Sequence, residues 1–111
     1  MTRWILEPDG TILTIDDPIQ WAAARKRDYR IAETDLPDGS WLSTVFLGVD
    51  HSFGSGGPPV LFETGWFASR QDMGDMREQW RWCTEAEARE GHARIADRLR
   101  AELAPPKEPT T

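Results

Sequence analysis

Six tryptophans in a chain of 111 residues place the strongest constraint on its fold. Each indole buries about 150–250 Å² when it is covered, so the chain needs a broad apolar surface to hold them. Five of the six fall in short β-prone runs, and the sixth, Trp21, falls in a helical run. We therefore expect a sheet that carries most of the indoles in its core and leaves one or two of them exposed.

Turn signals and periodic runs predict the order of the elements. Pro-Asp-Gly turns at 8–10 and 37–39 separate pairs of β-prone runs, and 41–47 is apolar on both faces, which is typical of a central strand. Strands are expected at 3–6, 11–15, 29–34, 41–47, 60–68 and 78–83, and helices at 18–28 and 84–103. The fold class that follows is α+β: a single, mainly antiparallel sheet in the order ββαββββα, with two helices packed on it.

Both helix starts carry capping signals. Asp17 precedes Pro18, a good cap before a favoured first helical residue, and Thr84 with Glu87 forms a capping box. The second helix continues as an apolar stripe at helical spacing, formed by Ala88, His92, Ile95, Leu99 and Leu103. We expect one domain over residues 1–103 and a disordered tail over the proline-rich residues 104–111.

Composition narrows the class of protein. Thirteen basic and nineteen acidic side chains give a net charge of −6, which argues against direct nucleic-acid binding. No apolar run approaches the ~20 residues of a membrane-spanning helix, and the first residues lack a secretory signal. The single cysteine, Cys83, excludes an internal disulfide and fits a reducing cytoplasm.

The centre of the chain resembles a known family. The matching text is WLSTVFLGVDHSFG at 41–54 and GPPVLFET at 57–64, followed by RWCT at 81–84 and EA…GH between 87 and 92. It is similar to a family of small proteins found in phage and prophage genomes, over roughly residues 41–100. The resemblance implies a phage or prophage setting and assigns no catalytic residues. Family members carry Glu-Thr-Met-Val/Ile-Phe where this chain has Glu63-Thr64-Gly65-Trp66-Phe67.

Four side chains suggest a metal site: Asp50, His51, Glu63 and His92. Imidazole and carboxylate groups bind zinc and other divalent ions, so a small metal-dependent hydrolase is one hypothesis. However, the chain has no His-x-x-x-His or Cys-x-x-Cys spacing, and His92 falls on the apolar stripe. A hydrogen-bonded core histidine is the alternative.

Charge and aromatic residues suggest two binding surfaces. Residues 31–69 contain five acids and no Lys or Arg, so an acidic surface forms if the turns lie at one end of the sheet. Trp80 and Trp82 share one strand face and are flanked by Arg77 and Arg81, which makes them the first exposed aromatic pair to consider. The candidate binding residues are Asp35, Asp38, Asp50, His51, Trp66, Trp80 and Trp82.

The leading functional hypothesis is a non-enzymatic phage or prophage accessory protein that binds a host or phage protein and needs no cofactor. One specific form is inhibition of a host nucleic-acid-handling defence complex, because an acidic surface can compete for a DNA-binding groove. Besides the hydrolase, a homo-oligomeric structural protein, such as a homodimer that buries the exposed tryptophans, stays open.

Overall fold

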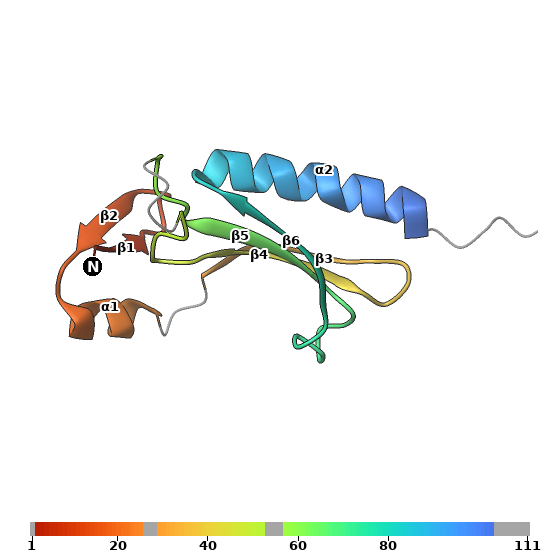
Figure 1. Cartoon of the computed structure of the whole chain (residues 1–111), viewed down its shortest axis with the longest axis horizontal. Coiled ribbons are helices and arrows are strands. Elements are labelled where there is room, and N and C mark those ends of the chain that lie inside the picture. The colour runs from red at the N-terminus through yellow and green to blue at the C-terminus, as the bar shows by residue number, and fades with distance from the viewer. Residues whose placement is uncertain (1, 26–28, 53–56, 104–111) are drawn as a thin grey trace, which may run out of the picture.

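A computed structural model describes residues 2–25, 29–52 and 57–103 of the chain. The fold is α+β, and Figure 1 shows its arrangement. The elements, in order, are β1 (Arg3–Leu6), β2 (Ile12–Ile15), α1 (Pro18–Arg25), β3 (Arg30–Asp35), β4 (Trp41–Phe46), β5 (Phe62–Phe67), β6 (Met76–Trp82) and α2 (Glu85–Leu103). The predicted order ββαββββα is confirmed, and β6 begins two residues earlier than expected.

The strands form two antiparallel sheets, so the prediction of a single sheet is wrong. One sheet is the hairpin β1-β2, and the other has the order β3-β4-β5-β6. Backbone bonding between the described parts of the two sheets consists of one isolated bridge, Arg3 to Val49, and of the Trp4 amide, which donates to the Gly48 carbonyl at 2.9 Å. Side chains of the hairpin, including Trp4 and Leu6, also pack against the core of the larger sheet. Gly48 has a φ of +77°, which turns the chain at the end of β4. The ladder therefore stops after one bridge.

Helix α1 packs on the hairpin and not on the four-stranded sheet, which corrects the expectation that both helices cover one sheet. Its predicted cap is confirmed, because the Asp17 carboxylate accepts the Ile19 amide at 2.9 Å. The helix is described to Arg25, and residues 26–28 of the expected helix lie outside the described part of the chain.

Helix α2 covers one face of the four-stranded sheet along its length (Figure 1). Its capping box is confirmed: the Thr84 amide donates to the Glu87 carboxylate at 3.1 Å, and the Glu87 amide donates to the Thr84 hydroxyl at 3.1 Å. The predicted stripe is also confirmed, since Ala88, His92, Ile95 and Leu99 are buried and Leu103 is partly buried against the core. Ala88 packs with Phe46 and Phe62 of the sheet, and Ile95 and Leu99 pack with Leu42.

Strand β4 is central and buried on both faces, as its sequence predicts. On the face away from α2, Trp41 is only 2% exposed although none of the described helices packs on that face. The guanidinium groups of Arg30 and Arg70 lie 4.8 and 5.1 Å from its ring centre and cover it instead.

No helix among the described residues is long and apolar enough to cross a membrane. The expected disordered tail, 104–111, and residues 53–56 between β4 and β5 lie outside the described residues.

Candidate functional site: a groove of tryptophan and arginine

Three of the six tryptophans gather on the sheet face that carries α2. In the strand register Trp82 lies opposite Phe62, Trp80 opposite Thr64 and Trp66 opposite Leu42, so the three indoles share one face. All three are half-buried, as are Trp4 and Trp21, whereas Trp41 alone is fully buried. More of the tryptophans are therefore partly exposed than the one or two that the sequence suggested.

A groove of about 400 Å³ runs between β6 and α2. Two indoles line its strand side and two arginines its helix side, and the full lining is Trp80, Trp82, Gly91, Arg94, Ile95 and Arg98. We call these six residues the tryptophan groove. Aromatic and arginine side chains are the types most enriched where proteins bind one another.

Trp82 is held rigidly on the floor of the groove. Its indole N–H donates to the Thr64 hydroxyl at 2.9 Å. Its ring rests on the helix backbone at Gly91, where an added Cβ would lie 2.3 Å from the ring. Both contacts place the indole before any ligand arrives, which lowers the entropic cost of binding.

The two arginines of the groove differ in their partners. Arg98 lies 5.8 Å from the Trp80 ring centre and forms long ion pairs, both 3.7 Å, with Glu78 and Glu102. Arg94 has no ion pair or hydrogen bond with any residue that the structure describes. A cation without a partner beside two indoles is available to an anionic group of a ligand.

These arginines are not the ones that the sequence suggested. Arg77 lies 5.1 Å from the Trp66 ring centre, and Arg81 forms an ion pair with Glu63 at 3.1 Å on the opposite face of the sheet. The sequence patterns did not point to Arg94 and Arg98, because these arginines come from α2 and not from the strand of the two indoles. Their four-residue spacing beside the apolar stripe was the available signal.

A buried polar chain lies behind the groove. The Thr64 hydroxyl, which accepts from Trp82, lies 2.6 Å from the Thr44 hydroxyl, and that hydroxyl lies 2.7 Å from His92 Nδ1. His92 Nε2 lies 2.9 Å from the Thr34 hydroxyl. Because the Trp82 indole can only donate, each hydroxyl can pass the donor role on in the direction of Thr34. His92 Nδ1 then accepts from Thr44, and His92 Nε2 carries the proton and donates to Thr34, so every atom of the chain has a partner. Burial lowers the pKa of His92, and the Arg100 charge lowers it further.

The acidic candidates lie at two ends of the four-stranded sheet. Asp35 ends β3 and Asp38 lies in the β3–β4 turn, whereas Asp50 and His51 follow the far end of β4. Because β4 is six residues long, about 20 Å separates the two groups. The condition for one acidic surface, both turns at one end, is not met.

Each of these acids already has partners. Arg70 donates to Asp35 at 2.9 Å and lowers the pKa of that carboxyl, and Arg77 donates to Asp38 at 3.0 Å. The Ser40 hydroxyl and amide, with Arg77, lower the pKa of Asp38 to about 2. The amides of Val60 and Ser52, both 2.8 Å away, lower the pKa of Asp50. The acidic stretch is therefore paired within the fold to a large extent.

The proposed metal ligands do not come together. His92 binds two threonine hydroxyls, Glu63 binds Arg81 on the other sheet face, and the His51 Nδ1 lies 3.1 Å from the Val49 carbonyl. Within the described ranges, no three His, Cys, Asp or Glu side chains are close enough to hold a metal ion.

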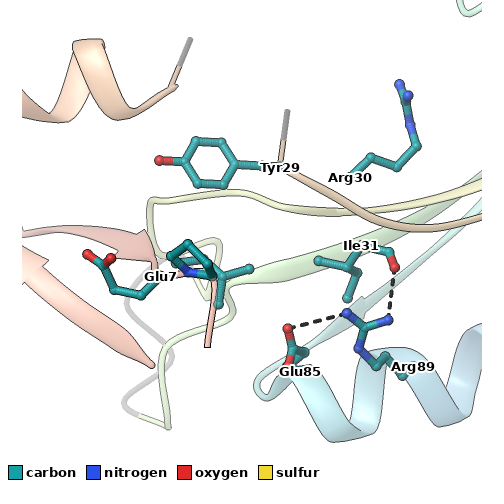
Figure 2. A pocket seen from close by; sticks show the side chains of 8 residues that line it. Glu7, Tyr29, Arg30, Ile31, Glu85 and Arg89 are labelled. Carbon is teal, nitrogen blue, oxygen red and sulfur yellow. Dashed lines mark hydrogen bonds and ion pairs between the residues drawn. The ribbon is translucent and has the colours of Figure 1, made fainter. Parts of the chain in front are cut away.

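A second hollow, of about 320 Å³, lies between the hairpin, the start of β3 and the start of α2 (Figure 2). The guanidinium group at its centre already has partners: Arg89 donates to the Ile31 carbonyl at 2.9 Å and pairs with Glu85 at 3.6 Å. Arg89 thus fastens α2 to the edge of β3 and offers less to a ligand than Arg94 does.

Comparison with known proteins adds no assignment: no family model, no curated protein and no solved structure matches this chain significantly.

Proposed function

We propose that this chain is a phage or prophage accessory protein that acts in the cytoplasm by binding another protein through the tryptophan groove. Its action is binding and not catalysis. The observation that carries this proposal is Arg94, a cation without a partner among the described residues, next to the fixed indole of Trp82.

The groove has the features of a binding hot spot. Its indoles offer large apolar areas with few rotatable bonds, and its arginines supply charge and direction. Gly91 and Thr64 hold Trp82 in place, so little order has to be created on binding. Truncation of a hot-spot residue to alanine typically costs about 2 kcal/mol of binding free energy or more.

The alternatives receive less support from the geometry. A metal-dependent hydrolase would need Asp50, His51, Glu63 and His92 at one place, and no three such side chains lie close enough to hold a metal ion within the described residues. A defence inhibitor that acts through one acidic surface would need Asp38 and Asp50 side by side, whereas they lie at opposite ends of β4.

The test is a pull-down with the full chain. The immobilised wild-type chain and its Trp80→Ala and Arg94→Ala variants are incubated with lysate of the bacterial host, and the bound proteins are identified by mass spectrometry. We expect a protein held by the wild type that both variants release, with affinity reduced roughly tenfold or more. Arg100→Ala, an arginine of α2 outside the groove, is the matched control and should retain the partner.

Retention of the same partner by Trp80→Ala and Arg94→Ala would refute a role for the groove. A wild-type chain that captures no protein above background at micromolar concentration would refute the binding function itself. Light scattering on the free chain separates the remaining hypothesis, because a homo-oligomer would show twice the monomer mass or more.

A further inference from the structure

The four-stranded sheet ends in two unequal edges, β3 and β6. On β3, a register shift between Arg30 and Ala32 interrupts the ladder, and Arg89 donates a hydrogen bond to the Ile31 carbonyl (Figure 2). Bulges and bound carbonyls are common devices that protect an edge from further pairing. Strand β6 pairs with β5 on one side, and no described strand lies on its other side. Strand β6 has a register shift of its own near its start, between the partners of Trp66 and Phe67, but beyond it Glu78–Trp82 pair regularly with β5 and have no described strand on their other side.

The alternation of backbone hydrogen bonds along the strands identifies the residues of β6 whose amide and carbonyl groups lie on the side away from β5. The Leu47 amide donates to the Leu61 carbonyl at 2.7 Å, in line with the register that pairs Val45 with Glu63. In an antiparallel ladder the bonding side alternates along each strand, so the even residues of β5 bond to β6. The amide and carbonyl groups of their partners Trp80 and Trp82 therefore point to β5, whereas those of Gln79 lie on the side away from β5.

This side of β6 and the tryptophan groove adjoin each other, because β6 supplies both. A strand added beside Glu78–Trp82 would place every second side chain over the indoles and the guanidinium groups of Arg94 and Arg98. The charged side chains that line the groove are both arginines, although the chain as a whole carries −6. Charge complementarity therefore favours an occupant with carboxylates on that face.

We propose that the partner docks as an extended segment that adds a fifth strand to β6, with acidic and apolar side chains on the face over the tryptophan groove. This inference rests on the proposed binding function and specifies how the groove is used. Main-chain hydrogen bonds to Gln79 supply affinity, and the carboxylates over Arg94 and Arg98 supply specificity.

A second copy of this chain is a poorer occupant. Antiparallel pairing of two β6 strands about a two-fold axis puts both α2 helices on the same face of the joined sheet. The arginines of one tryptophan groove would then face those of the other, and like charges brought together oppose association.

The test uses a displayed library of random seven-residue peptides, selected against the immobilised full chain. The enriched peptide is then synthesised, and its affinity is measured by titration calorimetry. We expect acidic and apolar residues two positions apart, and a loss of affinity of about tenfold or more in Arg94→Glu. Selected peptides without acidic residues, or an unchanged affinity in Arg94→Glu, would overturn the proposed chemistry.

Two further variants test the strand geometry. Gln79→Pro removes an N–H that the β5 ladder does not use, so we expect the fold to persist while peptide affinity drops about tenfold or more. N-methylation of alternate peptide amides leaves the protein untouched and should have the same effect. If both changes leave affinity within about twofold, strand addition is wrong.

The outcomes separate the two proposals. A lysate partner that Trp80→Ala releases and Gln79→Pro retains would uphold the binding function and overturn strand addition. If neither the lysate nor the library yields a ligand, the binding function itself fails. A single-stranded oligonucleotide that displaces the selected peptide at physiological salt would overturn the choice of a protein segment as occupant.

Discussion

His92 is a polar side chain in an otherwise apolar contact between helix and sheet. Its position on the apolar stripe left two interpretations open, a metal ligand or a hydrogen-bonded core residue. The structure supports the second, because both ring nitrogens lie within hydrogen-bond distance of threonine hydroxyls, Thr34 and Thr44. Such a chain stabilises the fold only when every member is satisfied, since an unpaired buried polar atom is costly.

Replacing Thr44 by Val tests this chain. The valine has nearly the same shape, but it leaves His92 Nδ1 and the Thr64 hydroxyl without their partner. We expect a loss of about 1–3 kcal/mol in the free energy of unfolding, measured by urea denaturation. Thr14→Val, at an exposed position of β2, is the matched control and should stay within about 0.5 kcal/mol of the wild type.

The pH dependence of stability should reveal His92 as well. Its pKa is lowered by burial, so the unfolded chain binds this proton at a higher pH than the folded chain does. Protonation therefore favours unfolding, and stability should fall as pH drops below about 6.5. The carboxyls with lowered pKa, such as Asp38 at about 2, act only in a more acidic range.

Urea midpoints between pH 8 and pH 5 measure this effect. The His92→Gln variant should lack the part of the decline that the wild type shows below pH 6.5. Parallel curves for the two proteins would contradict the assignment to His92.

At the scale of elements, α2 and β6 approach each other closely because α2 carries a glycine at its contact with Trp82. In an exposed helix, Gly→Ala stabilises by about 1 kcal/mol. Here an added Cβ would lie 2.3 Å from the Trp82 ring, so either the ring or the helix would have to shift.

Helix propensity alone would make Gly91→Ala stabilising, and we expect this substitution to be destabilising instead. We expect it to lower the free energy of unfolding by about 1–3 kcal/mol, to change tryptophan fluorescence and to weaken partner binding. Glu90→Ala, the adjacent exposed position, controls for the change in helix propensity. A more stable Gly91→Ala with unchanged fluorescence would show that Trp82 does not rest on this glycine.

At the scale of the whole molecule, the chain consists of two parts that differ in how much buried core stabilises them. The hairpin with α1 forms one part, and the four-stranded sheet with α2 forms the other (Figure 1). A two-stranded hairpin and an eight-residue helix are both marginal alone. The second part contains the fully buried side chains, including Phe46, Phe62 and Leu99.

Native-state hydrogen exchange should separate these parts. We expect the amides of β1, β2 and α1 to exchange about tenfold faster or more than those of β4 and β5. Mass spectrometry of peptic fragments measures this difference. Equal protection in both parts would mean that the hairpin unfolds only with the main sheet.

Local patterns predicted the parts of the fold that depend on neighbouring residues. Asp17 and Thr84 cap the two helices, the stripe of α2 is buried, and β4 is central. These features follow from spacing along the chain, which sets the face on which a side chain lies. The same spacing indicated that Trp80 and Trp82 share a face.

What the sequence alone determined is therefore the α+β class, the order of the elements and the shared face of Trp80 and Trp82. Only the tertiary structure decided that the hairpin forms its own sheet, that Arg70 and Arg77 neutralise Asp35 and Asp38, and that Arg94 and Arg98 join the indoles. The reason is physical. Periodicity acts over a few residues, whereas these pairings join segments far apart in the chain. Strand pairing in the main sheet brings Arg70 and Arg77 to Asp35 and Asp38, and the packing of α2 brings Arg94 and Arg98 to the indoles.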